Sequence, residues 1–106
     1  MKRDTDIEVV LDMDRLPPDI GVRSPAGRYD FSEADVGDIL EWAEDRIDTE
    51  YPITVVIRGY CPHFVLVPLQ HLVEVYAAEG SVVRYDFVPL RGKRFTVFDH
   101  TEEVVA

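Results

Sequence analysis

A run of five residues at positions 53–57, Ile-Thr-Val-Val-Ile, constrains the fold of this chain more than any other segment. Pro52 precedes the run and Gly59 follows it closely, so the segment is short and sharply bounded. A continuous β-branched run is typical of a strand that is covered on both faces. Such strands occur in sheets that helices cover, so the sequence predicts a layered α/β domain built around this strand.

Two segments with helical periodicity flank the strand. Ser32 is a suitable N-cap, with Asp35 three residues later, and an apolar stripe continues to Ile47. A second helix is predicted over 63–79, and Gly80 is suited to its C-terminal end. Because Pro68 lies inside this helix, we expect a kink or a tightened first turn.

The remaining segments complete the predicted fold. Alternation over 7–13 predicts a half-buried strand, and 15–31 reads as a long loop with a short strand near Tyr29 and Phe31. Further strands are predicted over 82–88 and 95–99, joined by a turn at 91–93. We therefore expect one small domain over 1–106, of the α/β (α+β) class, in the order β-α-β-α-β-β. Its four- to five-stranded mixed sheet carries two helices, with parallel pairing among the first three strands.

The charge of the chain excludes several functions. Twenty-one acidic residues against eleven Lys and Arg give a net charge of -10 over 106 residues. This balance argues against binding to bulk nucleic acid or to an anionic membrane, although a small anionic ligand can still respond to a local field. The first ten residues lack the apolar region of a signal peptide, and Cys61 is the only cysteine. We therefore expect a protein without disulfides in the cytoplasm.

Most of the negative charge lies on the first helix and its flanks. Nine acidic residues and one basic residue, Arg46, occur between Asp30 and Glu50. A solvated helix face is the simple interpretation. The alternative is a non-enzymatic interaction module, such as an inhibitor, immunity or antitoxin-like protein, that binds a basic partner through helix 33–48.

The turn Gly-Tyr-Cys-Pro-His-Phe at 59–64 is the first candidate binding site. It joins the carboxyl end of the buried strand to a helix N-terminus, where open α/β sheets bind anionic ligands. Its residues could contact a phosphate, although a plain strand-to-helix turn would look the same, and Cys61 fits a small semi-buried thiol better than a nucleophile. The residues expected at the ligand are Gly59, Tyr60, Cys61 and His63.

The last hairpin is the second candidate. If its loop contains only residues 92–94, Asp86 lies beside His100 on the neighbouring strand, where a carboxylate can orient an imidazole for acid–base chemistry. A surface ion pair is the alternative. Four of the eleven basic residues also lie here and could bind phosphate or protect a sheet edge: Arg84, Arg91, Lys93 and Arg94.

Taken together, residues 53–100 resemble the small stand-alone CRISPR-associated ring nucleases of type III systems. After an apolar strand, the shared pattern contains G-x-x-P, an aromatic residue two positions later, L-x-H, a strand ending in Tyr-Asp, and a final His. In this chain the pattern comprises Gly59, Pro62, Phe64, Leu69, His71, Tyr85, Asp86, Leu90, Val97 and His100. The chain departs from the family at Phe64, which is usually Trp, at Glu74, usually His, and at 87–88, usually Pro-Arg.

The resemblance implies a ferredoxin-like or related core and cleavage of a cyclic oligoadenylate, which would switch off antiviral signalling. The ligand's own 2′-OH would attack the adjacent phosphorus, with His100, Asp86 and His71 as catalytic residues. Arg84, Arg91 and Lys93 would offset phosphate charge. A homodimer suits a ring-shaped ligand. No cofactor is required, or Mn²⁺ binds His71, Glu74, Asp86 and His100.

Overall fold

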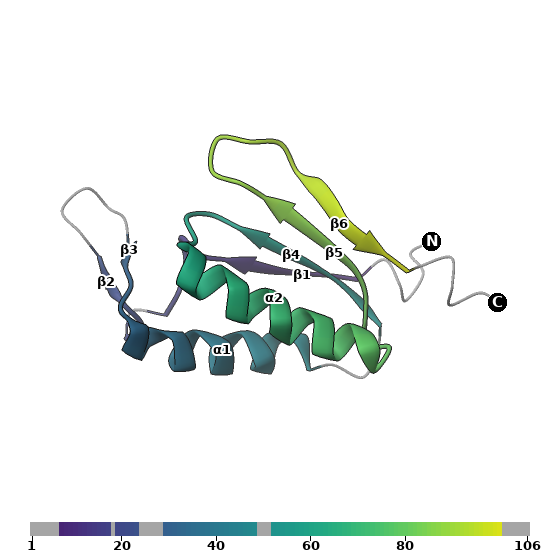
Figure 1. Ribbon diagram of the computed structural model, residues 1–106, viewed down its shortest axis with the longest axis horizontal. Helices are drawn as coiled ribbons and strands as arrows, with labels where there is room; N and C mark the ends of the chain where they lie inside the picture. Colours follow the sequence, from purple (N-terminus) through teal and green to yellow (C-terminus); the bar gives the residue numbers. More distant parts are fainter. Residues whose placement is uncertain (1–6, 18, 24–28, 49–51, 101–106) are drawn as a thin grey trace.

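In the computed structural model, the strand predicted at 53–57 is an inner strand of a four-stranded sheet (Figure 1). The structure describes residues 7–17, 19–23, 29–48 and 52–100. The strand order is β1 (Glu8–Asp12), β4 (Ile53–Arg58), β5 (Val82–Val88) and β6 (Phe95–Asp99). The first three strands are parallel and β6 is antiparallel, so the predicted mixed sheet is confirmed.

Both helices cover the same face of this sheet (Figure 1). Helix α1 (Glu33–Ile47) connects β1 to β4, and α2 (His63–Ala78) connects β4 to β5. The two crossovers step in the same direction along the sheet, and right-handed crossovers of that kind place their helices on one side. Within the described ranges, the opposite face therefore carries no helix. This β-α-β-α-β-β order differs from the β-α-β-β-α-β order of a ferredoxin-like fold, to which it is related only as a two-layer α+β domain.

A small second sheet lies between β1 and α1 in the sequence. Strands β2 (Val22–Arg23) and β3 (Tyr29–Asp30) pair antiparallel, so the short strand expected near Tyr29 is confirmed. Among the described residues, no helix is long and apolar enough to span a membrane.

The helix ends form as the sequence predicts. The Asp35 carboxylate accepts hydrogen bonds from the Ser32 backbone N–H at 2.8 Å and from the Ser32 hydroxyl at 3.1 Å. Helix α2 continues through Pro68, and its first turn is tightened because Val65 N–H and Leu66 N–H both donate to the Pro62 carbonyl. Gly80 ends α2 with φ +86°, a conformation that residues with a Cβ rarely adopt.

The hydrophobic core lies between the sheet and the two helices. Ile53, Val55 and Ile57 of β4 point into it and are fully buried. On the opposite, helix-free face, Thr54 and Val56 are also buried, so β4 is covered on both faces as its sequence predicts. Because no helix lies over Thr54 and Val56, long polar side chains must shield them, and these side chains form the first feature of the candidate site.

Candidate functional site

Asp86 is a fully buried carboxylate on the helix-free face of the sheet. Its exposed fraction is 0%, and it lies beside Val56 in the pairing of β4 with β5. Arg84 Nε donates to Asp86 Oδ1 at 3.0 Å, and Arg94 Nε donates to Oδ2 at 2.6 Å. Two guanidinium groups therefore neutralise a charge that would otherwise be costly to bury.

Arg94 also reaches the far edge of the sheet. Its Nη2 donates to Glu8 Oε2 at 2.8 Å, so one side chain links β1 to the β5–β6 hairpin across β4. We call Glu8, Asp86 and Arg94 the clasp. Glu8 had no predicted role and Arg94 was predicted only as part of a basic patch, because contacts across 86 residues leave no local sequence signal.

Burial and hydrogen bonding shift the pKa of Asp86 in opposite directions. Burial alone would raise the pKa of this carboxyl group, but the bonds from Arg84, Arg94 and Thr96 outweigh burial and hold the pKa below its ordinary value. Asp86 is therefore a stable anion. It is poorly suited to exchange a proton with a substrate near neutral pH.

The predicted pairing of Asp86 with His100 is wrong. Asp86 pairs with Thr96, Arg84 pairs with Asp99, and the His100 backbone N–H donates to the Val83 carbonyl at 2.7 Å. The proposal that Asp86 orients His100 therefore has no support in the structure, and Asp86 has a structural role in the clasp instead.

The register differs because the hairpin loop contains residues 89–94 rather than 92–94. Pro89 has no N–H to donate, so strand pairing stops at Val88, and Gly92 N–H closes a turn onto the Pro89 carbonyl at 3.0 Å. Arg91 adopts φ +62° in this loop. A bulge between Tyr85 and Asp86 shifts the register once more.

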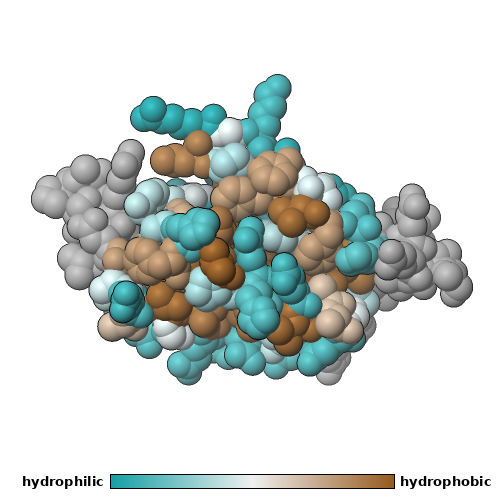
Figure 2. Space-filling view, viewed as in Figure 1, coloured by the Kyte–Doolittle hydropathy of each residue, from teal (hydrophilic) through white to brown (hydrophobic). Residues whose placement is uncertain are grey.

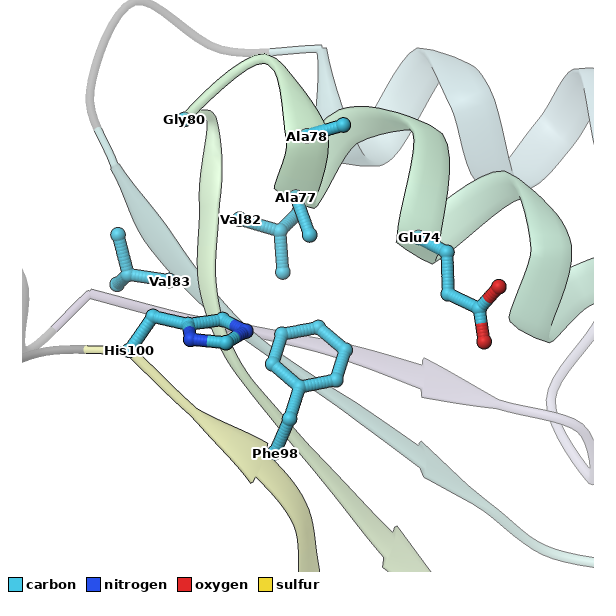
Figure 3. A pocket seen from close by; sticks show the side chains of 8 residues that line it. All are labelled: Glu74, Ala77, Ala78, Gly80, Val82, Val83, Phe98 and His100. Atoms are coloured by element: carbon cyan, nitrogen blue, oxygen red, sulfur yellow. The ribbon is translucent and has the colours of Figure 1, made fainter.

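His100 lies instead on the helix-covered side of the sheet, next to α2. Its ring centre is 5.0 Å from that of Phe98, and both residues line a pocket of about 470 Å³ between α2 and the end of β6. In Figure 3 the Phe98 ring of β6 lies beside the ring of His100, which follows the strand, and Glu74 extends from α2 on the other side of the opening. The other lining residues are Ala77, Ala78, Gly80, Val82 and Val83.

The four residues proposed to bind Mn²⁺ do not come together. His71 is exposed one turn before Glu74 on α2 and does not line the pocket of Glu74 and His100, while Asp86 lies on the opposite face of the sheet. Among the described residues, no group of three His, Cys, Asp or Glu side chains could hold a metal ion. These four residues therefore do not fit a shared Mn²⁺ site.

The basic residues of the hairpin separate into two groups. Arg84 donates hydrogen bonds to Asp86 and, at 3.0 Å, to the Thr96 hydroxyl, and it forms an ion pair with Asp99 at 4.0 Å. Arg91 and Lys93 are exposed in the loop. This loop follows the carboxyl end of β5, whereas His100 lies beside the amino end of β5, so these two cations do not line the His100 pocket of their own chain.

The turn at 59–64 contacts a carboxylate. Tyr60 N–H donates to Asp14 Oδ1 at 3.4 Å, and a Cβ added to Gly59 would lie 2.8 Å from Asp14 Oδ2. Asp14 thus contacts the turn at which the sequence predicts a phosphate. The turn also lies at the end of the sheet opposite His100, since it follows the carboxyl end of β4. His63 is exposed, and burial raises the pKa of the Cys61 thiol to about 12.

A groove around Trp42 was not predicted. Its volume is about 310 Å³, and it lies between α1 and the loop that follows β1. Its lining includes four carboxylates as well as the indole: Asp19, Asp38, Glu41 and Asp45. The acidic residues of the helix were evident from the sequence. The position of the loop after β1, which forms the other wall of the groove, could not be predicted from it.

Comparison with known proteins adds no relationship: no family model, no curated protein and no solved structure matches the chain.

Proposed function

We propose that this protein is a ring nuclease, which binds a cyclic oligoadenylate and cleaves one phosphodiester bond of it at the pocket of His100. The observation that carries the proposal is the pocket itself, where an imidazole, a carboxylate and an aromatic ring surround one opening. The family resemblance names the ligand. The pocket supports a location for this chemistry that differs from the one predicted from the sequence.

The chemistry needs few protein groups. The ribose 2′-oxygen of the ligand forms a bond to the adjacent phosphorus, and the bond from phosphorus to the 5′-oxygen breaks. The products are a 2′,3′-cyclic phosphate and a 5′-hydroxyl. One proton leaves the 2′-hydroxyl and another joins the leaving oxygen, so a base and an acid are needed. His100 can serve as either, and Glu74 is its counterpart across the pocket.

The pocket suits one nucleotide of the ring. Its volume of about 470 Å³ lies within the usual range for small-ligand sites. A nucleobase could stack on the Phe98 ring, which contributes about 1–3 kcal/mol per base in single-strand binding proteins. The Glu74 carboxylate can accept a hydrogen bond from the exocyclic amine of adenine.

The decisive experiment is incubation with labelled cyclic tri-, tetra- and hexa-adenylate, with EDTA and with Mn²⁺ in parallel. We expect cleavage of at least one ring, and His100→Ala should slow it by about 10²- to 10⁴-fold. Phe98→Leu should raise KM more than it lowers kcat. Arg58→Gln, at the opposite end of the sheet, is the matched control. If the protein neither binds nor cleaves any of these rings, the proposal that it is an enzyme is refuted.

The groove around Trp42 supports a second candidate, the acidic interaction module. Arg46 of the same chain already lies over the Trp42 ring, 5.5 Å from its centre, so an arginine or lysine side chain of a partner would pair with the carboxylates of the groove, Asp38, Glu41 or Asp45. This candidate predicts salt-sensitive binding of a basic peptide that Trp42→Ala weakens and His100→Ala does not. Binding of the peptide without any ring cleavage would favour it over the nuclease.

A further inference from the structure

Strand β1 forms one edge of the main sheet. It pairs with β4 on one side, and in the described part of the chain no strand pairs with its other side. The register of β1 with β4 runs from Glu8 to Asp12 without a shift, so β1 is a regular strand. A regular edge strand presents a row of unpaired N–H and C=O groups, to which a further strand can bind.

Two hydrogen bonds to β4 show which backbone groups of β1 point out of the sheet. Thr54 N–H donates to the carbonyl of Ile7 at 2.8 Å. Met13 N–H donates to the carbonyl of Arg58, also at 2.8 Å. Because the backbone groups of a strand alternate in direction, the odd-numbered positions of β1 bond to β4, and positions 8, 10 and 12 direct their groups to the free edge.

A pocket of about 550 Å³ lies along this edge, between β1 and α1, and we call it the edge pocket. The residues of β1 that line it are Val10 and Asp12, which are two of the residues with outward backbone groups. The Val10 carbonyl accepts from Arg46 Nη2 of α1 at 3.5 Å, which is long for a hydrogen bond. A backbone N–H of an incoming strand can therefore replace this contact at little cost.

The side chains of the edge pocket favour a peptide with one apolar and one acidic side chain. Its apolar lining includes Leu16, Pro17 and Trp42. Its charged lining residues are two cations and one carboxylate: Arg15, Arg46 and Asp12. Asp12 pairs with Arg15 at 3.8 Å, whereas Arg46 lies over the Trp42 ring and, within the described ranges, forms no ion pair. The Arg46 guanidinium is therefore available to a carboxylate of a partner.

The direction of α1 sets the order of these two contacts. Helix α1 runs antiparallel to β1 (Figure 1), so Arg46 lies closer to the start of β1 than Trp42, one turn earlier, does. Figure 2 shows hydrophilic side chains along the lower margin of the molecule, where Figure 1 places α1. An apolar side chain of a partner therefore finds its contact beside the strand edge rather than on the outer side of the helix.

We infer that the edge pocket binds an extended peptide of another protein, which pairs antiparallel with β1 as a fifth strand of the main sheet. Antiparallel pairing is the more stable arrangement per residue, and the peptide residue opposite Val10 exchanges both backbone hydrogen bonds with it. The side chain of that residue lies on the helix-free face, as Val10 does beside Val56. The two neighbouring side chains of the peptide then face α1, where an apolar one contacts Trp42 and an acidic one pairs with Arg46. This binding depends neither on the proposed nuclease function nor on the acidic groove around Trp42.

Fluorescence anisotropy of a labelled peptide tests the proposal. The probe is fluorescein-labelled Thr-Val-Thr-Glu-Thr, in which Val and Glu occupy the two positions that face α1 in antiparallel pairing. We expect saturable binding to the full chain. Lysine in place of the glutamate, or the reversed sequence Thr-Glu-Thr-Val-Thr, should weaken binding by about fivefold or more. No binding by the wild type, or a control peptide that binds as tightly as the probe, would overturn the proposal.

Two substitutions test the two kinds of contact separately. Val10→Pro removes an outward N–H but no hydrogen bond within the sheet, and should weaken binding by about tenfold or more. Val10→Thr, which keeps the N–H, is the matched control and should bind as the wild type does. Arg46→Gln should abolish the preference for glutamate over lysine in the peptide. Unchanged binding by Val10→Pro, or an unchanged preference in Arg46→Gln, would contradict the assigned contacts.

Amide hydrogen exchange tests the pairing in the wild type, so this result does not depend on the folding of any variant. With saturating probe peptide, the Val10 N–H should exchange about tenfold more slowly or less. The Met13 N–H, which already donates to the Arg58 carbonyl, is the internal control and should change little. If the peptide protects other residues and leaves the exchange of Val10 unchanged, the pairing with β1 is wrong.

Discussion

Asp86 and His100 lie on opposite faces of the same hairpin. Tyr85 and Phe98 pair with each other and point towards the helices, as does the His100 ring that packs beside Phe98. Asp86, one position after Tyr85, points to the helix-free face. The two residues thus serve different purposes: Asp86 holds the sheet together, and His100 faces a pocket.

Replacing Asp86 by asparagine should destabilise the fold by about 2–3 kcal/mol at pH 7, because two guanidinium groups lose their shared buried anion. The loss should depend on pH. Because the folded pKa of Asp86 is depressed, its contribution is complete above the unfolded pKa of about 3.9 and is lost as the pH falls through the folded value.

Denaturant unfolding followed by the fluorescence of Trp42, the only tryptophan, measures this effect. The difference in unfolding free energy between wild type and Asp86→Asn should narrow from about pH 5 towards pH 2. A difference that stays constant over this range would show that the ionised carboxylate does not stabilise the sheet.

The two contacts of Arg94 in the clasp, with Asp86 and with Glu8, should contribute differently to the free energy of unfolding. Arg94→Ala leaves the buried Asp86 with one fewer donor and should cost about 2 kcal/mol or more. Glu8→Gln removes only a half-exposed partner of the same arginine and should cost at most about 1 kcal/mol. Comparing both variants in one series of denaturant titrations checks this order, and equal losses would contradict it.

Two glycine substitutions should change the free energy of unfolding in opposite directions. Gly59→Ala should destabilise by about 1–3 kcal/mol, because φ is +93° and the new Cβ would lie 3.0 Å from the Asp14 backbone nitrogen. Gly37→Ala lies within α1, where a Cβ meets nothing within 4 Å, and should stabilise by about 0.5–1 kcal/mol. Thermal unfolding of the two proteins tests both directions at once.

The Cys61 thiol should be inert in the folded protein. Burial raises the pKa of the Cys61 thiol to about 12, so its thiolate fraction at pH 8 falls about a thousandfold below that of a thiol with the ordinary pKa of 9.0. Mass spectrometry should show slow modification by iodoacetamide under native conditions and rapid modification in denaturant. Fast native alkylation would return Cys61 to the set of candidate nucleophiles.

The helices and strands were predictable because their signals are local. The β-branched run of β4, Ser32 with Asp35, and Gly80 each determine nearby backbone geometry with residues that are close in sequence. The parallel pairing of the first three strands also followed, since each helical crossover returns the chain in the same direction.

The site was not predictable in the same way. The assumed loop of three residues placed Asp86 beside His100, although Pro89 was already a signal that pairing stops earlier. A second signal was the alternation of Arg84 and Asp86, which indicates a face without a helix. The contacts of Arg94 with Asp86 and Glu8 depend on the assembled sheet, and so does the pocket between α2 and β6.

The clasp cannot form on the ribosome until position 94 has been synthesised. Glu8 and its guanidinium partner at position 94 are 86 residues apart, so the ribosome adds Arg94 long after Glu8. Until then Asp86 has only Arg84 beside it, and β5 has no antiparallel neighbour. A nascent chain that stalls before position 94 therefore exposes an open sheet edge, which makes it a ready target for chaperones and proteases.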